Sequence, residues 1–288
     1  MNGYLLYDEK EAKRNEAFID DLQKEAAARN MTLTLVTHVE EIPNDASFVF
    51  ARIREGELIE QLENRGIRVF NRSEVVTLAN DKFATMAFAN ELGIPTVPTE
   101  RIESIGSITY PYPIVIKTTT GHGGREVYLC QSPEMVARTM EEYPEADWIA
   151  QPYIESNKSD VRVFVLGTEI LGAIHRQGTK HSFKSNYTLG GAIEKFNVDE
   201  ELRHYVETLA TTLKSDYVGI DFLLPATGGY VLNEIEDPVG ARSLYAYDVP
   251  VAAKILDYIV GSLAEQKEAK NRIRLLRLFF HPCLIFSF

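Results

Sequence analysis

The chain has 288 residues, enough to bury a sizeable hydrophobic core and to form two or three subdomains. Its formal net charge of −12 at pH 7 argues against a nucleic acid or an anionic membrane as a partner, because a surface of like charge repels both. The two cysteines, Cys130 and Cys283, lie far apart and belong to no CxxC or Cys/His cluster. The sequence therefore predicts neither a disulfide framework nor a zinc site.

The two ends of the chain bear on where the protein works. The N-terminus lacks a basic segment followed by an apolar run, so the sequence predicts a cytoplasmic protein without a signal peptide. The tail 267–288 is basic and then apolar, and its apolar part is too short to span a bilayer, so no transmembrane segment is expected. This tail could pack on the body, lie on a membrane surface or be foreign to the domain, and we assign it no function. The sequence leaves a homo-oligomer open.

Short apolar runs alternate with helical patterns in the first part of the chain. Strands are predicted at 4–7, 33–36, 48–50 and 67–70, with helices between them from Ala17 and around Leu58–Leu62. Strands that alternate with helices indicate a parallel sheet. We therefore expect a small parallel α/β domain at 1–78.

The rest of the chain mixes strands and helices in a different order. A helix is predicted at 79–92, because Gly93 and Pro95 end it, and a final helix at 250–263. Another helix is expected at 200–213, and one at 135–142. Strands are predicted at 114–117, 127–129, 148–151, 161–165, 170–174, 218–224 and 229–235.

Three acidic residues are expected to meet on the last of these hairpins. Side chains alternate along a strand, so Glu234 and Glu236 should share one face with Leu232, and Asn233 should point the other way. Antiparallel pairing would bring Asp221, on the other arm, near both glutamates. Carboxylates this close repel one another unless a cation neutralises them, and their hard oxygens suit Mg²⁺ or Mn²⁺. The alternative interpretation is a solvated strand face at the edge of a sheet.

A glycine-rich segment follows the predicted strand that ends in Lys117. It contains Gly121, Gly123 and Gly124, and glycine lets backbone N–H groups approach phosphate oxygens closely, while Arg125 could add charge. The segment matches neither GxxxxGK(S/T) nor GxGxxG, so neither a P-loop nor a Rossmann site is predicted. The alternative is a plain glycine-rich hairpin turn.

Basic residues gather on and after two neighbouring predicted strands. They are Arg162, Arg176, Lys180 and Lys184. If they face the glycine-rich segment, they would bind anionic oxygens, as phosphoryl transfer requires. The alternative is a charged surface strand.

In this order, the segments resemble the ATP-grasp superfamily and, within it, the RimK-like group of α-L-glutamate and amino-acid ligases. The resemblance covers about 1–265 and is specific as an ordered set. It implies an α/β fold of the α+β ATP-grasp kind, in which the domain at 1–78 precedes a central subdomain at 79–150 and a C-terminal subdomain at 151–266 that together clasp ATP. The stretches that carry it are Val69-Phe70-Asn71, Asn80-Asp81-Lys82-Phe83, Leu92-Gly93-Ile94-Pro95-Thr96, Pro113-Ile114-Val115-Ile116-Lys117, Gln151-Pro152-Tyr153-Ile154, Ser159-Asp160-Val161-Arg162-Val163-Phe164, Phe183-Lys184-Ser185-Asn186, Val218-Gly219-Ile220-Asp221 and Asn233-Glu234-Ile235-Glu236.

The resemblance also implies roles for individual residues. Lys82 and Lys117 look like the lysines that hold the nucleotide phosphates, and Gly121, Gly123 and Gly124 lie in the loop that would close on them. Gln151, Pro152, Tyr153 and Ile154 resemble the linker that meets adenine. Asp160 looks like the ribose ligand, and Lys184 and Asn186 look like further nucleotide contacts. Arg176 and Arg162 resemble residues that steady the substrate carboxylate and an acyl-phosphate, and Asp221 and Glu234 match metal-binding acids.

The sequence departs from the family pattern at three places. The metal-site pattern of the family is Glu-x-Asn, whereas Glu236 stands at the last position here. The glycine-rich segment lacks the GxQGxGV form. Lys184 stands at a basic position near the nucleotide, and a lysine there loses bidentate contact with phosphate.

The reaction that the resemblance implies is an ATP- and Mg²⁺-dependent ligation. A carboxylate attacks the γ-phosphate of ATP, and an amine displaces phosphate from the resulting acyl-phosphate. The expected partners are ATP and a small-molecule carboxylate and amine, or a protein or peptide acceptor, with Arg52 and Arg54 as candidates for gripping an anionic one. Two alternatives remain: a kinase that phosphorylates a hydroxyl, and a non-catalytic nucleotide-binding protein.

Overall fold

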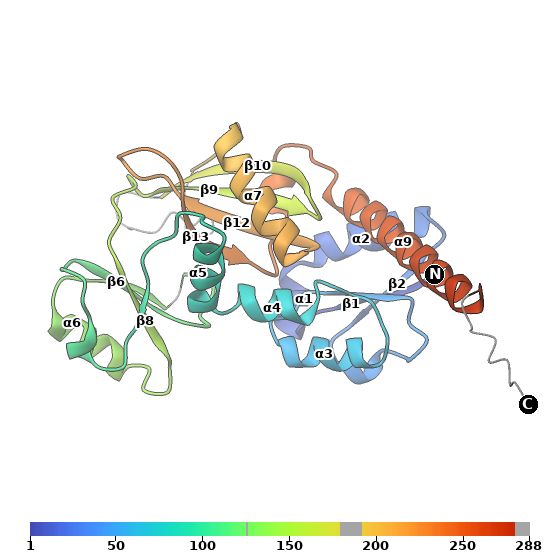
Figure 1. The fold of residues 1–288 in the computed structure, drawn as a ribbon, viewed down its shortest axis with the longest axis horizontal. Coiled ribbons are helices and arrows are strands. Elements are labelled where there is room, and N and C mark those ends of the chain that lie inside the picture. Colours follow the sequence, from blue (N-terminus) through green and yellow to red (C-terminus); the bar gives the residue numbers. More distant parts are fainter. Residues whose placement is uncertain (125, 179–191, 280–288) are drawn as a thin grey trace, which may run out of the picture.

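The computed structural model describes residues 1–124, 126–178 and 192–279 of the protein. Within these residues the strands form three sheets, which follow one another along the longest axis of the molecule (Figure 1). One sheet is parallel and the other two are antiparallel. The mixed α/β fold class that the sequence predicts is therefore confirmed.

The N-terminal sheet has the order β2-β1-β3-β4, and its described strands all run parallel. Helix α2 packs its buried face on this sheet, because Phe18, Ile19, Leu22 and Ala26 recur at helical spacing. The elements are β1 (Asn2–Leu6), α1 (Glu9–Arg14), α2 (Glu16–Ala28), β2 (Thr32–Val36), β3 (Phe48–Ala51), α3 (Gly56–Asn64) and β4 (Val69–Phe70).

Two helices, rather than one, connect this sheet to the rest of the chain. They are α4 (Ser73–Ala79) and α5 (Lys82–Glu91), so the helix predicted at 79–92 begins later than expected. The break occurs because the Asp81 carboxylate accepts hydrogen bonds from the N–H groups of Phe83 and Ala84, at 2.9 and 3.0 Å, and thereby caps a new helix. Lys82 consequently stands in the first turn of α5, where its side chain is buried.

The central sheet is antiparallel and has the order β5-β8-β6-β7. Its apolar side chains, among them Ile114, Ile116 and Trp148, pack with Val136 of helix α6 in a small core of their own. The elements are β5 (Glu100–Arg101), β6 (Ile114–Thr118), β7 (Val127–Cys130), α6 (Pro133–Glu141) and β8 (Trp148–Pro152).

The C-terminal sheet is also antiparallel, with the order β11-β10-β9-β12-β13. Helix α7 covers one face with Leu202, Val206, Leu209 and Ala210, which are buried as its apolar spacing requires. The elements are β9 (Ser159–Leu166), β10 (Glu169–Gln177), β11 (Ala192–Lys195), α7 (Glu200–Leu213), β12 (Tyr217–Leu223), β13 (Val231–Glu236) and α8 (Arg242–Tyr245).

The N-terminal and C-terminal sheets are tied together by the buried side chain of Asn71, which directly follows β4. Its amide nitrogen donates to the Tyr217 carbonyl at 2.8 Å and to the Asp237 carboxylate at 3.0 Å. Its amide oxygen accepts from the N–H groups of Asp216 and Tyr217. One side chain therefore joins the end of the parallel sheet to the start of β12 and to the residue that follows β13.

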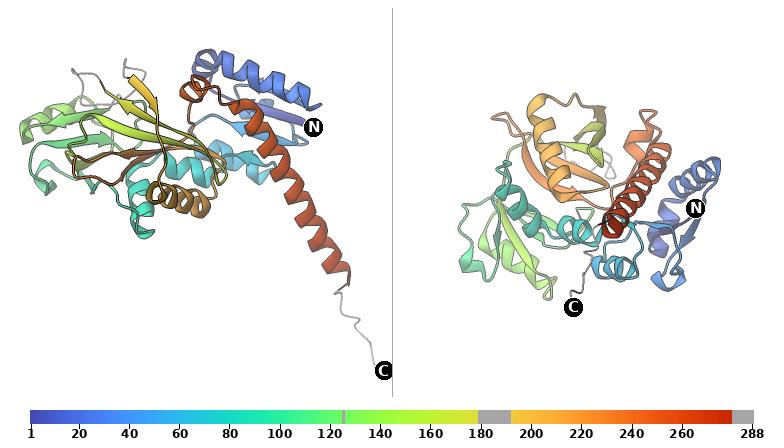
Figure 2. Two further views of the ribbon diagram at one scale, coloured as in Figure 1. Left: turned by 90° about the horizontal axis from the view of Figure 1, so that it is seen from above. Right: turned by 45° about the vertical axis from the view of Figure 1, so that its right-hand side comes forward.

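The last helix, α9 (Val251–Phe279), is much longer than the predicted helix at 250–263. Its first half packs against α2 through Val251, Ile255 and Ile259. Residues 264–273 are exposed, and the helix runs out beyond the body of the molecule (Figure 2). The predicted helix ended too early, because nothing in the sequence between residues 263 and 279 stops a helix. Gly261 is the one glycine of the helix, no proline interrupts it, and the residues that follow are strong helix formers. In the described part of the chain, no helix has both the length and the apolarity that crossing a bilayer requires.

Candidate active site

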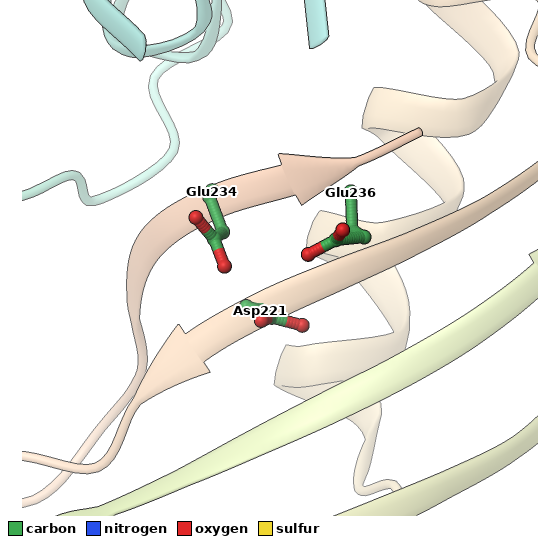
Figure 3. A group of neighbouring side chains, drawn as sticks. All are labelled: Asp221, Glu234 and Glu236. Carbon is green, nitrogen blue, oxygen red and sulfur yellow. The ribbon is translucent and has the colours of Figure 1, made fainter. Parts of the chain in front are cut away.

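The three acids predicted on the last hairpin come together in the structure. Asp221 of β12 pairs in register with Glu234 of β13, and Glu236 lies one pleat further along the same strand. Each of the three offers a carboxylate oxygen, and these oxygens lie within 4.8 Å of one another (Figure 3). An oxygen set of this kind fits Mg²⁺ or Mn²⁺. Asp221 is fully buried.

A β-bulge in this hairpin changes the expected faces of β13. Asp221 pairs with Glu234 but Phe222 pairs with Leu232, so Asn233 is an extra residue on its strand. The prediction that Leu232 shares a face with Glu234 is therefore wrong: Leu232 lies in the hydrophobic core. The prediction that Asn233 points away from Glu234 is wrong for the same reason, because both side chains line one cavity.

Two arginines neutralise the acids from the neighbouring strands. Arg162 of β9 donates from Nε and Nη2 to the two oxygens of Asp221, each at 2.6 Å, and from Nη2 to Glu236 at 2.9 Å. Arg176 of β10 donates to Asp160 at 2.6 and 2.9 Å and to Asp221 at 2.6 Å. Burial raises the pKa of the Asp221 carboxyl, but the two guanidinium groups outweigh it and hold that pKa far below its usual range.

Glu234 titrates very differently from Asp221. Burial, together with the negative charges of Glu236 and Asp221, raises the pKa of Glu234 to about 7. Its contact with a guanidinium is also longer, at 3.8 Å from Arg162. The cluster therefore holds one firmly ionised carboxylate beside one that gives up its proton near neutral pH.

Two buried lysines face the acids from the other side. Lys117 of β6 donates from Nζ to the side-chain oxygen of Asn233 at 2.9 Å, and Lys82 of α5 donates to the Gly121 carbonyl. Burial lowers the pKa of Lys82, and it lowers the pKa of Lys117 to about 8 with a further contribution from the nearby charge of Lys82. An anion bound beside such a lysine would raise its pKa again.

A cavity of about 120 Å³ lies between the central and C-terminal sheets, and we name it the first cavity. Its apolar walls are Val97, Val115, Val127 and Leu223. Most of the residues that the sequence links to a nucleotide line it, namely Lys82, Lys117, Gly121, Gly124, Gln151, Pro152, Tyr153, Ile154 and Asp160. Gly123 lines the neighbouring cavity instead. Lys180, Lys184 and Asn186 lie outside the described residues.

A second cavity, of about 170 Å³, lies next to the first, between the N-terminal and C-terminal sheets. Arg176 and His122 line both cavities, and Arg162 and Glu236 line the second. Among its described lining residues, six arginines stand against two glutamates. The arginines are Arg14, Arg52, Arg54, Arg162, Arg176 and Arg242, and the glutamates are Glu11 and Glu236.

Sequence reasoning found only part of this second cavity. Arg52 and Arg54 follow β3 and were expected, but Arg14 at the end of α1 and Arg242 at the start of α8 were not. Nothing in their local sequence distinguishes them from ordinary surface arginines. Their common position follows from how the N-terminal sheet is set against the C-terminal sheet.

Comparison with known proteins assigns the family. The family model described as the RimK-like ATP-grasp domain matches residues 79–259. The chain therefore belongs to the RimK-like ATP-grasp family, as its ordered motifs indicate.

Relatives with and without a named activity match part of this chain. Over 176 residues the chain is 32% identical to an uncharacterized protein of Mycoplasma pneumoniae, a match that spans 61% of this chain and 61% of that protein. It is 29% identical over 212 residues to the glutamate–LysW ligase ArgX of Sulfurisphaera tokodaii, over 69% of this chain and 74% of the relative. A probable alpha-L-glutamate ligase of Haemophilus influenzae is 26% identical over 211 residues, 70% of each chain.

Solved structures share the fold. The D-alanine–D-alanine ligase of Bacillus anthracis, solved in complex with ATP, has a TM-score of 0.73 at 15% identity and covers 94% of this chain and 99% of its own. A RimK domain ATP-grasp protein of Sphaerobacter thermophilus has a TM-score of 0.71 at 22% identity, over 90% of this chain and 100% of its own. At these identities the similarity shows the fold alone.

Proposed function

We propose that the protein is an ATP- and Mg²⁺-dependent ligase that joins a carboxylate to an amine through an acyl-phosphate, with release of ADP and phosphate. The observation that carries this proposal is that two neighbouring cavities share the charged side chain of Arg176 and both border the cluster of acids. The first cavity brings lysines and acids together, and the second is lined by arginines. The relatives named as glutamate ligases support the reaction class.

In this proposal the first cavity takes ATP. Lys82 and Lys117 hold the phosphates, and the Gly121–Gly124 segment lies over them. The linker from Gln151 to Ile154 meets the adenine, together with apolar walls that suit a flat ring. Asp160 is the candidate for the ribose, and its pairing with Arg176 would fix its position.

Asp221, Glu234 and Glu236 would hold Mg²⁺, since their oxygens converge and carry the negative charge that it requires. When bound, the ion would neutralise charge on the phosphates during transfer. Arg176 lines both cavities, so its guanidinium can contact a transferred phosphoryl group and a substrate carboxylate together. Arg162 is the second guanidinium at this junction.

We further propose that the second cavity takes the carboxylate substrate and favours one with more than one negative charge. Arg54, which follows β3, and Arg242 of α8 both line it, and arginine binds carboxylates in a bidentate manner. Loss of one such contact typically costs about 1.5–3 kcal/mol, which is roughly a tenfold to hundredfold effect. Arg54→Ala and Arg242→Ala should therefore raise the KM for the acidic substrate with little effect on kcat, whereas Arg203→Ala on the exposed face of α7 should change neither.

The ligase proposal is tested by following ADP and phosphate release from Mg-ATP with pools of amino acids and small carboxylates. We expect both products to appear only with an effective pool, and to disappear in Lys117→Met. Release of ADP without phosphate would indicate transfer to a hydroxyl, as in a kinase. ATP binding without release of either product, in every pool, would refute catalysis of this kind.

A further inference from the structure

One nitrogen atom contacts all three acids of the candidate metal site. Nη2 of Arg162 lies 2.6 Å from Asp221, 2.9 Å from Glu236 and 3.8 Å from Glu234. The oxygens of these three carboxylates lie within 4.8 Å of one another. The guanidinium therefore occupies the space on which the acids converge.

A divalent cation would need the same space. Mg²⁺ binds its oxygen ligands at about 2.0–2.1 Å, so an ion shared by the three acids would draw their oxygens towards itself and compete with Nη2 for them. We propose that Arg162 is the counter-ion of the metal-free site and that a metal ion must displace it, so that metal binding turns this guanidinium towards the second cavity.

The charge balance explains why such a counter-ion is useful. Three carboxylates held this close would repel one another, and Asp221 is fully buried, so without a cation they would protonate or spread apart. Arg162 supplies that cation, because a guanidinium keeps its charge in proteins and its Nη2 contacts all three acids. Arg162 thus keeps the metal-free site folded, at the expense of affinity for the metal.

The rest of the site can stay in place when Arg162 moves. Asp221 keeps its 2.6 Å hydrogen bond from Arg176, which is itself held by both oxygens of Asp160. Arg162 already lines the second cavity, as Arg54 does, so its guanidinium can turn towards a ligand there without leaving its strand. This step rests on the proposed function, because the second cavity is the proposed carboxylate site.

Coupling between the two cavities follows from the exchange. A metal ion that releases Arg162 adds a guanidinium to the second cavity, and a carboxylate that engages Arg162 empties the metal position. By thermodynamic linkage each ligand then strengthens the binding of the other by the same factor. Arg162 is a positioning residue in this scheme, since it couples the filling of one cavity to the filling of the other.

The test measures Mn²⁺ binding to the full-length, nucleotide-free protein by calorimetry and by the electron paramagnetic resonance signal of free Mn²⁺. Arg162→Met removes the competing cation and keeps an unbranched apolar side chain of comparable length. We expect Mn²⁺ to bind this variant at least about tenfold more tightly than the wild type, a change of about 1.4 kcal/mol. Arg54→Met is the matched control, because it also removes a positive charge from the second cavity. Of the three acids, Arg54 forms an ion pair with Glu236, at 3.9 Å, so this variant should change the affinity for Mn²⁺ by less than about threefold.

Thermal unfolding gives a second readout. Arg162→Met should melt at a lower temperature than the wild type in EDTA and regain most of the loss with Mn²⁺, because the ion replaces the missing charge. If this variant does not fold, Arg162→Lys keeps one charge but loses the forked contact, and its Mn²⁺ affinity should lie above that of the wild type. Unchanged or weaker Mn²⁺ binding in the variants, or no binding to any of them, overturns the inference.

The two proposals can fail separately. Tighter Mn²⁺ binding by Arg162→Met, together with no acceptor-dependent ADP release by the wild type, would keep the counter-ion role and remove the ligase. Acceptor-dependent ADP and phosphate release by the wild type, together with weaker Mn²⁺ binding by Arg162→Met, would keep the ligase and show that Arg162 supports the metal rather than competing with it.

Discussion

Replacing Asp221 by asparagine tests how strongly the site's charges hold the C-terminal sheet together. The Asp221 carboxylate is fully buried and accepts three hydrogen bonds of 2.6 Å from two guanidinium groups. Removing one partner of a buried ion pair costs about 3–5 kcal/mol. The lower end applies here, because Arg162 keeps Glu236 and Arg176 keeps Asp160. We expect a loss of about 3 kcal/mol in the free energy of unfolding.

Such a loss should lower the melting temperature by about 6–12 °C, at about 2–4 °C per kcal/mol for a chain of this size. The assay is thermal unfolding by circular dichroism in EDTA. Since the pKa of Asp221 is lowered, its stabilisation is present above the usual carboxyl range and is lost only as pH falls towards the folded-state pKa. The contribution of Asp221 itself should therefore stay constant from about pH 5 to 8, whereas Glu234, whose raised pKa depends in part on the Asp221 charge, adds a pH dependence near neutral pH. A decrease under about 2 °C would refute the view that Asp221 anchors both arginines.

Three further substitutions probe other parts of the site. Phosphate contact should raise the pKa of Lys117, which burial lowers to about 8, so ATP binding at pH 8 should take up protons, as measured by calorimetry in buffers of different ionisation enthalpy. Lys117→Arg should take up fewer protons, and equal uptake by the variant and the wild type would contradict the role of Lys117. Asn71→Ala removes four buried hydrogen bonds between two sheets and should cost about 2–4 kcal/mol in urea unfolding; a loss below about 1 kcal/mol would show that other contacts hold the sheets together. Gly219→Ala places a Cβ 2.6 Å from Val239 and 3.2 Å from Arg162, so it should lower the free energy of unfolding by about 1–3 kcal/mol and change the affinity for Mn²⁺. If this variant keeps both the stability and the Mn²⁺ affinity of the wild type, Arg162 does not pack against Gly219.

The sequence predicts the parts of this molecule whose pattern is local. Antiparallel pairing of the last two strands is expected to bring Asp221 near Glu234 and Glu236, and the structure brings the three acids together. The parallel N-terminal sheet follows from strands that alternate with helices. In both cases the spacing along the chain determines the contact.

Prediction failed where a single residue changes the start of a helix or the register of a strand, and where a tertiary contact determines which residues come together. Asp81 begins a new helix by capping its first turn, although the apolar pattern runs on through it. The extra residue Asn233 shifts the alternation of β13, and a bulge leaves no clear trace in the hydrophobic pattern. Arg14 and Arg242 line one cavity only because two sheets face each other, an arrangement that no local spacing encodes.

Strand β13 explains why so much of the site depends on the arrangement of the sheets. Its residue Leu232 forms hydrogen bonds with the Pro95–Val97 segment that leads into the central sheet, through the Pro95 carbonyl at 2.8 Å and the Val97 N–H at 3.2 Å. At the end of the same strand, Asp237 accepts from Asn71 of the N-terminal part. The acids at 234 and 236 thus lie on a strand that all three parts of the protein hold. Lys117 reaches that strand through the bulged Asn233, so a shift of the central sheet would change the charge around the acids directly. Opening or closing of the first cavity must therefore alter the electrostatics of the candidate metal site, even though the acids themselves belong to a single hairpin.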